Sequence, residues 1–492
     1  MPSTLFTTVR CGLGGPLADV LVTDGRVAAV GAAGTVSAPD AQRVTARDAT
    51  LLPGFVDGHV HVEQWARHLH SVDLGAATGP LEAAAALRSA LGTAPGRERV
   101  HWGHGIVPAL WSTAPHKRHL DDAVGDLPVA VSSIDLHTTW LNSAALALVG
   151  LGEHPTGVLR ETESIQTKAR LAAMTPEAEL DGWIREAVGG LPALGVTGLT
   201  DLAYADTIAD WQRRSAAGAP PVRVRAGIWE PWLEAAVAGG HRSGAVVAGT
   251  DGRVRVGPFK IVSDGSLNTR TAWCVDPYPH PSDDAGRYGL CLVDPDDLVD
   301  LMSRAWAAGL EPAVHAIGDR ANRAVLDAFE QVGCPGRVEH AQLVRREDMA
   351  RFARLDVVAS VQPQHAVTDR DVADLHWAGR TDRAFAFRSL LDAGARLELG
   401  SDAPVSPLDP RMAIADAVYR TDDERPAWHP EQTVPLEVAV AAASAGVDGV
   451  ETGMVADLVL VEGDPHELDR EGLRTLGVLA TMVEGTFTYR EV

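Results

Sequence analysis

Two histidines stand two positions apart in His59-Val60-His61, directly after the apolar segment Pro53–Asp57. On an extended chain, residues two apart point to the same side, so both imidazoles can converge on one cation. Neutral imidazole is a strong ligand for zinc and similar metals. A pair of polar histidines at the end of a strand explains this motif equally well. A metal site therefore depends on partners elsewhere in the chain.

Further residues that could take part in this chemistry lie within, end or follow apolar segments: Lys260, His315, His340 and Asp402. Histidines on two consecutive predicted strands, in register with the first pair, favour a metal site. An ammonium cannot ligate a cation, but a buried lysine has a lowered pKa, and its free amine can add carbon dioxide to form a metal-bridging carbamate. From the residues alone, an ion pair between Lys260 and Asp264 is the simpler interpretation. Asp402 fits either a helix N-cap or a metal ligand and general base.

Eight apolar segments are candidate strands, and they alternate with helical segments as in parallel α/β folds. They are Pro53–Asp57, Val196–Leu202, Val222–Ile228, Val254–Val262, Glu311–His315, Arg337–His340, Val357–Gln362 and Arg396–Gly400. A TIM-type (β/α)8 barrel has eight such strands in about 250 residues and places its active site at their C-terminal ends. The sequence therefore predicts an α/β barrel whose mouth gathers the candidate residues.

Both ends of the chain are rich in short strands and turns, unlike the middle. The strand-like segments there are Ala18–Thr23, Arg26–Val30, Ala456–Glu462 and Leu476–Val483. We predict that residues 1–52 and 435–492 pair into one composite β-domain, a small β-sandwich, around a barrel of residues 53–434. The interval after the first barrel strand is too long for one crossover, which predicts an inserted subdomain at about residues 76–176.

The bulk composition restricts the class of protein. The 492 residues are 46% hydrophobic and carry a formal net charge of −23, which argues against binding to nucleic acid or to an anionic membrane. Four cysteines form no CxxC pair, which fits a reducing compartment. Without a signal-peptide pattern or a long apolar stretch, we expect a cytoplasmic protein. The oligomeric state stays open, a homo-oligomer included.

Several different motifs follow one another in a fixed order along nearly the whole chain. They include Ala18-Asp19-Val20-Leu21-Val22, Leu52-Pro53-Gly54-Phe55-Val56-Asp57-Gly58-His59-Val60-His61, Trp140-Leu141-Asn142-Ser143, Lys260-Ile261-Val262-Ser263-Asp264-Gly265-Ser266-Leu267, His315-Ala316-Ile317-Gly318-Asp319, Val361-Gln362-Pro363-Gln364-His365 and Gly400-Ser401-Asp402-Ala403-Pro404. Together they resemble the amidohydrolase superfamily, and within it the amidohydrolase-3 group of YtcJ-like and N-substituted formamide deformylase-like enzymes.

The resemblance implies a metal-dependent hydrolase that cleaves a C–N bond, in an amide, an N-formyl group or a related group, with a metal-activated hydroxide. It implies one or two divalent metals, with zinc expected, held by His59, His61, Lys260, His315, His340 and Asp402. In this reading Lys260 is carboxylated, and Asp402 is also the catalytic base. His137, His365 and Arg270 are candidates for substrate binding, although both histidines could equally be polar residues without contact to substrate. Asn268-Thr269 and Gly103-His104-Gly105-Ile106 depart from the family pattern, so the family's substrates do not transfer.

Two alternatives remain. A mononuclear deaminase of the same superfamily would use His59, His61, one later histidine and Asp402, and the in-register Lys260 speaks against it. A noncatalytic scaffold on the hydrolase fold is the other alternative. Such relatives typically lose metal ligands, and none is missing from this sequence.

Overall fold

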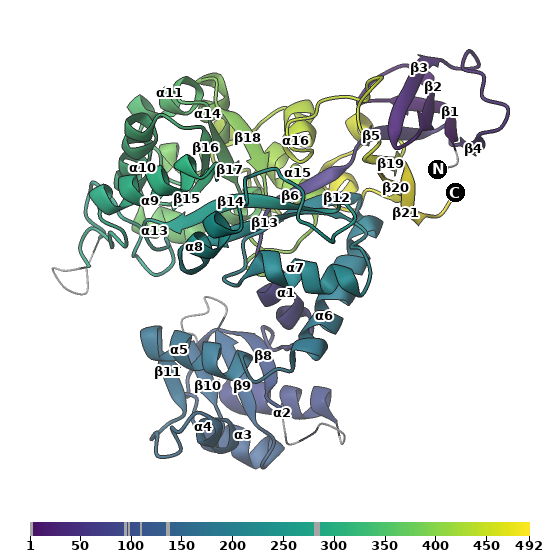
Figure 1. The fold of residues 1–492 in the computed structure, drawn as a ribbon. Helices are drawn as coiled ribbons and strands as arrows, with labels where there is room; N and C mark the ends of the chain where they lie inside the picture. Colours follow the sequence, from purple (N-terminus) through teal and green to yellow (C-terminus); the bar gives the residue numbers. More distant parts are fainter. Residues whose placement is uncertain (1–2, 93–95, 97–98, 109–110, 134–137, 280–285) are drawn as a thin grey trace. The chain divides into compact units, whose positions relative to one another are not determined.

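The computed structural model describes residues 3–92, 96, 99–108, 111–133, 138–279 and 286–492. It consists of two compact units, Met1–Val62 with Val188–Val492 and Glu63–Ala187. The larger unit contains an eight-stranded parallel sheet and a second sheet built from both chain ends, and the smaller unit contains a five-stranded sheet (Figure 1).

The parallel sheet forms the centre of the larger unit. In spatial order its strands are β18 (Arg396–Leu399), β17 (Val357–Val361), β16 (Gly336–His340), β15 (Pro312–Ala316), β14 (Val254–Val262), β13 (Arg223–Trp229), β12 (Val196–Asp201) and β6 (Phe55–Val60). Beyond the two end strands, the backbone N–H of Asp402 donates to the carbonyl of His59 at 2.7 Å, and that of His61 donates to the carbonyl of Ala403 at 3.0 Å. These bonds close the sheet, and the predicted TIM-type α/β barrel is confirmed.

Helices follow the barrel strands. They are α7 (Thr207–Ala216), α8 (Glu230–Ala238), α9 (Pro295–Ala307), α10 (Asp319–Val332), α11 (Arg346–Arg354), α12 (Pro363–Thr368), α13 (Arg370–His376), α14 (Phe387–Asp392) and α15 (Pro410–Tyr419). Of these, α7, α9 and α15 begin at an aspartate whose side chain caps the first turn. In α15, for example, the side chain of Asp409 accepts the N–H of Arg411, and Pro410 occupies the first turn, where its missing N–H costs nothing.

Each predicted barrel strand overlaps an observed one, but the first is displaced. Residues Ala49–Pro53 form β5 of the end sheet, where Pro53 pairs with Leu458. The chain then enters the barrel through Gly54, where a Cβ atom would lie only 2.1 Å from Cγ2 of Thr197. Strand β6 therefore reaches Val60, and His59 lies within the strand.

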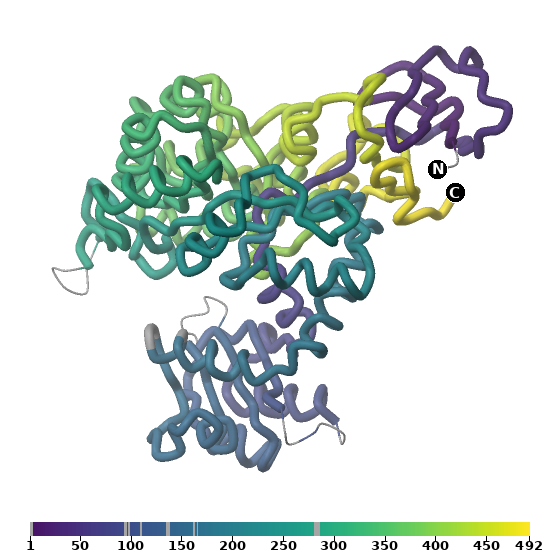
Figure 2. Tube along the Cα trace, in the orientation of Figure 1, coloured from purple at the N-terminus to yellow at the C-terminus, as the bar shows by residue number. Residues whose placement is uncertain are grey.

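The sheet from the chain ends contains β1 (Thr4–Cys11), β2 (Leu17–Thr23), β3 (Arg26–Ala32), β4 (Gln42–Thr45), β5 (Ala49–Pro53), β19 (Leu458–Glu462), β20 (Val478–Val483) and β21 (Thr486–Arg490). Their order is β21-β20-β19-β5-β1-β2-β3, with β4 on β1, so the purple and yellow ends of the chain lie side by side (Figure 2). Asp24 and Gly25 turn the β2–β3 hairpin with φ of 51° and 76°. A separate, largely antiparallel sheet from both termini is thus confirmed.

The smaller unit has its own core. Its elements are β7 (Val72–Asp73), α2 (Pro80–Leu91), β8 (His101–Ile106), α3 (Lys117–Val124), β9 (Val129–Ser133), β10 (Thr138–Leu141), α4 (Ser143–Leu148), β11 (Val158–Arg160) and α5 (Glu161–Ala172). Leu87, Leu120, Val131 and Trp140 are buried between its sheet and helices. This unit extends on both sides beyond residues 76–176, and the division of the larger unit at residues 53 and 434 stays a prediction.

No helix among the described residues combines the length and the apolar character that crossing a bilayer requires.

Candidate metal centre

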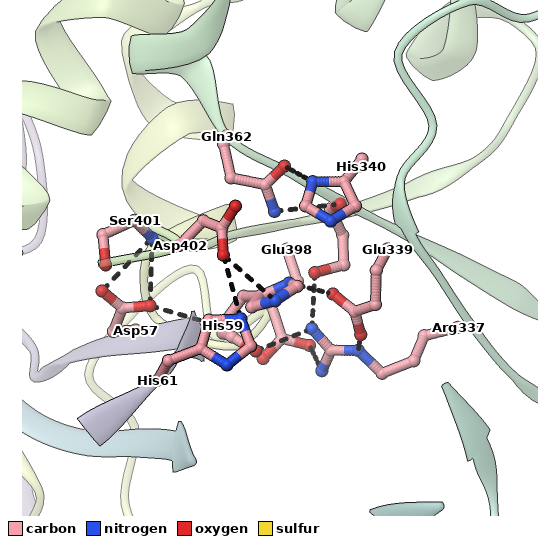
Figure 3. Close-up of polar contacts among 12 residues, drawn as sticks. Asp57, His59, His61, Arg337, Glu339, His340, Gln362, Glu398, Ser401 and Asp402 are labelled. Atoms are coloured by element: carbon pink, nitrogen blue, oxygen red, sulfur yellow. Dashed lines mark hydrogen bonds and ion pairs between the residues drawn. The ribbon is translucent and has the colours of Figure 1, made fainter. Parts of the chain in front are cut away.

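The two histidines of the first barrel strand meet Asp402, which follows the last strand. The Nε2 atoms of His59 and His61 lie 3.4 and 3.2 Å from the same carboxylate oxygen, Oδ1 of Asp402 (Figure 3). The His59 side chain is fully buried, while those of His61 and Asp402 are 23% and 12% exposed. Ligand atoms of these three residues all lie within 4.8 Å of one another, so they could hold one cation.

A second cation-sized group shares the same carboxylate. His340, His365 and Asp402 also place one ligand atom each within 4.8 Å of one another. His340 ends β16, whereas His365 lies in α12, beyond β17. Nε2 of His365 is 3.9 Å from Oδ2 of Asp402. One oxygen of Asp402 thus faces the first pair of histidines, and its other oxygen faces His365.

Lys260 and His315 complete the predicted set at the mouth. The His315 ring centroid lies 4.5 Å from that of His340, while its Nε2 lies 3.3 Å from Oδ1 of Asp264. His315 is therefore adjacent to the second group without belonging to it. Lys260 is 2% exposed, and burial lowers its pKa to about 8, against the opposing effect of the carboxylates of Glu339 and Asp402.

The protonation states of these side chains fit a divalent metal. Burial lowers the pKa of His59 to about 4 and that of His340 well below its ordinary value. Burial would raise the pKa of Asp402, but the imidazoles around it, His59 first, hold it well below the usual range. Neutral His59 and His340 thus lie beside an ionised carboxylate, and imidazole with carboxylate is a donor set that zinc and related metals take.

Two of these imidazoles also have unsatisfied nitrogens. Nε2 of His59 and Nε2 of His365 are buried and have no hydrogen-bond partner among the described residues. Leaving a buried polar atom unpaired costs about 1–3 kcal/mol. Beside a carboxylate, such nitrogens can donate their lone pairs to a metal ion. The residues present therefore fit a divalent metal.

A buried ion pair between Arg337 and Glu339 orients the His59 ring through its Nδ1 atom. Oε2 of Glu339 lies 2.7 Å from Nδ1 of His59, and Nε of Arg337 donates to Oε1 of Glu339 at 2.5 Å. Burial would raise the pKa of Glu339, but Arg337, followed by His59, holds it well below its usual range. The ionised Glu339 therefore accepts the Nδ1–H of His59, and this tautomer leaves Nε2 directed at Asp402.

The sequence contains a signal for this pair that the prediction did not use. Arg337 and Glu339 stand two apart in a buried strand, so they point to the same face. The guanidinium also donates to Oε2 of Glu398 at 2.9 Å and to the carbonyl of Gly58 at 2.9 Å. Charges inside a barrel strand indicate a polar layer beneath the mouth.

Two further contacts support the ligands. Oε1 of Gln362 lies 2.9 Å from Nδ1 of His340. Asp57 accepts the backbone N–H groups of His59 at 2.9 Å and of Ser401 at 3.1 Å. The carboxylate of Asp57 thus ties the strand that carries the first histidines to the segment that carries Asp402.

The sequence pattern that defines the amidohydrolase family matches residues 42–489 of the chain. The chain belongs to the amidohydrolase family. The family predicted from the motifs is therefore confirmed.

Known proteins resemble this amidohydrolase along most of their length. N-substituted formamide deformylase of Arthrobacter pascens is 28% identical over 541 residues, which cover 96% of this chain and 94% of that protein. YtcJ of Bacillus subtilis is 28% identical over 506 residues, covering 92% and 91%. The crystal structure of a metal-dependent hydrolase from Pyrococcus horikoshii shares the fold, with a TM-score of 0.83 at 24% identity over 95% of this chain and 99% of that one.

The three candidate substrate-binding residues of this amidohydrolase lie in three different situations in the structure. His137 lies outside the described residues. His365 belongs to the second cation-sized group. Arg270 lies in the loop after β14 with a left-handed φ of 59°, and its charge adds to burial in lowering the pKa of His376. Arg270 therefore stays a candidate for binding substrate.

Proposed function

We propose that this amidohydrolase hydrolyses the C–N bond of a small-molecule amide, N-formyl compound or related substrate at a divalent metal centre. The observation that carries the proposal is the ionised Asp402 beside His59 and His365, whose buried Nε2 atoms have no hydrogen-bond partner among the described residues. These groups meet at the C-terminal ends of the barrel strands, where enzymes of this fold place their active sites.

The proposed ligands form two groups around Asp402. His59, His61 and Asp402 would hold one metal, and His340 would hold a second together with His315 or His365. Zinc is the expected metal for this imidazole–carboxylate set. When bound, it would polarise the scissile carbonyl and lower the pKa of a water molecule.

We propose further that Lys260 is carboxylated. Burial lowers its pKa to about 8, so a substantial fraction of free amine is present near neutral pH. The amine adds to the carbon of CO2 and releases one proton, and the product is an anionic carbamate. Because Glu339 and Asp402 already bring negative charge to Lys260, the carbamate requires cations beside it. The unmodified alternative is an ammonium that neutralises these carboxylates.

Asp402 is the proposed catalytic base. Its carboxylate is ionised, and its side chain is 12% exposed at the mouth. It would accept the proton of the attacking water and deliver that proton to the leaving amine nitrogen. His137, His365 and Arg270 remain the proposed contacts to substrate.

We also propose a cytoplasmic location. All four cysteines are free, and two of them, Cys274 and Cys334, are buried, as expected for a protein from a reducing compartment.

The proposal is tested by metal stoichiometry together with a screen of N-acyl and N-formyl amines. We expect two divalent metals per chain, hydrolysis of at least one amide, and a carbamate signal of Lys260 in 13C NMR after labelling with 13C-bicarbonate. One metal per chain with unmodified Lys260 would instead favour the mononuclear deaminase. Metal-replete protein that cleaves no C–N bond of either substrate class would contradict the proposed function.

A further inference from the structure

Two neighbouring strands of the barrel carry none of the proposed metal ligands. Strands β12 and β13 lie between β6, which carries His59, and β14, which carries Lys260. Three aromatic residues follow their C-terminal ends instead: Tyr204 in the loop after β12, Trp229 at the end of β13, and Trp232 in α8. We call these three residues the aromatic rim.

The aromatic rim is a packed cluster of rings. The Tyr204 ring centroid lies 5.0 Å from that of Trp229 and 5.4 Å from that of Trp232, at interplanar angles of 80° and 76°. Edge-to-face pairs of this kind are a favourable arrangement of aromatic rings. The two indoles thus hold the phenol in place before any ligand arrives.

Backbone contacts connect the rim to both sides of the metal centre. Trp229 pairs in register with Lys260 of the next strand, and paired residues of neighbouring strands project to the same face of a sheet. The indole Nε1 of Trp229 donates to the carbonyl of Leu202 at 3.1 Å. The N–H of Leu202 donates in turn to the carbonyl of Val60, between the two first histidines, at 2.7 Å. The rim is therefore part of the mouth.

The outer part of the rim is open to solvent. Tyr204 is 58% exposed, although it is anchored by two tryptophans. A rigid, preplaced aromatic surface beside a catalytic mouth gains free energy when an apolar group covers it. A hollow of about 580 Å3 next to the rim is lined by four acidic residues, Glu230, Asp294, Asp297 and Asp300, and by one basic residue, Arg304. The excess of acidic residues in this hollow disfavours a negatively charged group there.

We propose that the aromatic rim is the substrate-selecting wall of this amidohydrolase and that it binds an uncharged aromatic substituent of the amide. The inference rests on the proposed function, because it assigns the substrate class of the same site. The ring can enter on the acyl side or on the amine side of the scissile bond, and the substrate series below separates these two arrangements.

The test compares three amides. N-methylacetamide is the baseline, N-(naphthylmethyl)acetamide carries the ring on the amine side, and N-methyl-naphthylacetamide carries it on the acyl side. We expect one naphthyl amide to exceed the baseline in kcat/KM by more than about tenfold in the wild type, since an aromatic contact of this kind is worth roughly that factor. Tyr204→Ala should remove most of this preference, measured as the ratio of kcat/KM for the naphthyl amide to kcat/KM for N-methylacetamide.

Matched variants separate the rim from a general effect of losing an aromatic ring. Tyr204→Phe keeps the ring and should keep the preference. Trp306→Ala removes another exposed indole, 37% exposed near the C-terminal end of α9, and should also keep it. If neither naphthyl amide is preferred, or if Tyr204→Ala and Trp232→Ala both retain the preference, the rim does not select the substrate.

A binding measurement makes the outcome independent of turnover. Naphthylmethanol has the ring but no scissile bond, and calorimetry should show that Tyr204→Ala weakens its binding about tenfold while Tyr204→Phe does not. If no amide is cleaved but this pattern is found, the proposed function fails and the rim stands as an aromatic site. If amides are cleaved but binding of naphthylmethanol does not depend on Tyr204, the rim is overturned and the proposed function stands.

Discussion

The mouth of the barrel and the core of the end sheet are equally buried but differ in what their side chains require. In the end sheet, Phe6, Val20 and Leu458 are at most 1% exposed and pack in one apolar cluster. At the mouth, His59 and Glu339 are 0% exposed, and Glu339 has two specific partners, Arg337 and His59. Equal burial therefore serves two different purposes.

This difference separates stability from chemistry. Apolar groups stabilise the fold roughly in proportion to the area that they bury, whichever apolar neighbours surround them. Buried polar groups destabilise it unless each has its partner. The unpartnered Nε2 of His59 is thus a cost that a bound cation would offset. Substitutions in the end sheet should change stability, whereas substitutions at the mouth should change metal binding and turnover.

The largest effect is expected from removing the metal. Dialysis against a chelator should abolish hydrolysis, and added zinc should restore it. Because a ligand of the native state alone stabilises that state, a metal present at 1,000 times its Kd should contribute about 4 kcal/mol to the free energy of unfolding. Calorimetric melting with and without zinc measures this shift. His59→Ala is the control and should lose most of it. An unchanged melting temperature in the wild type would contradict a metal centre at this site.

Next in size is the loss of the base in Asp402→Asn. Asparagine keeps the shape and one ligating oxygen, so metal should largely remain, while turnover should fall roughly 10²–10⁴-fold. Asp409→Asn is a matched control, because Asp409 caps α15 through its side chain and Asn caps a helix about as well as Asp. Steady-state kinetics on both variants test whether the loss of turnover is specific to Asp402. Near-normal turnover in Asp402→Asn would show that Asp402 is not the catalytic base.

A smaller effect at the mouth is expected for Glu339→Gln. Glutamine retains the size of the side chain but not the charge that fixes the tautomer of His59. The affinity for metal should weaken about 10–100-fold, as is typical for residues that support a ligand. Competition with a chromophoric chelator measures this affinity. The surface variant Glu347→Gln, 55% exposed in its side chain, should leave it unchanged. Equal affinities in both variants would show that Glu339 contributes only to folding.

The sequence predicted that the candidate ligands gather at the mouth because this depends on local order. Each candidate lies near the end of an apolar strand or just after it, and parallel strands bring such positions together once their number and direction are known. Asp402 and His59 illustrate this, since closure of the barrel alone makes them neighbours.

Contacts that depend on packing across the barrel were not predicted. The Glu339–His59 contact joins residues 280 positions apart. In the sequence, Glu339 stood out only as a charged residue within a predicted strand. His365 lies in a helix beyond β17, so no strand-end rule placed its nitrogen near Asp402. The start of β6 was misplaced because Pro53 belongs to the end sheet, a pairing with Leu458 that local periodicity does not encode.

The smallest effect on turnover is expected for substitutions in the end sheet. They test whether this sheet contributes to stability without contributing to the chemistry at the mouth. Phe6 is 1% exposed on β1, and its ring centroid lies 6.1 Å from that of Phe487. Phe6→Ala should lower the free energy of unfolding by about 3–5 kcal/mol, because it removes apolar area and leaves a cavity. Well below the melting temperature, however, the folded enzyme should keep its metal content and its kcat.

Two further variants calibrate this result. Phe6→Leu fills much of the same space and should cost clearly less than Phe6→Ala, whereas Val30→Ala, at a residue 37% exposed on β3, should cost almost nothing. Denaturant unfolding gives the three free energies, and active-site titration gives kcat per folded molecule. A fall of kcat in step with stability would mean that the end sheet also positions the mouth. The connection through Pro53 and Gly54 into β6 is the route by which such coupling would reach His59.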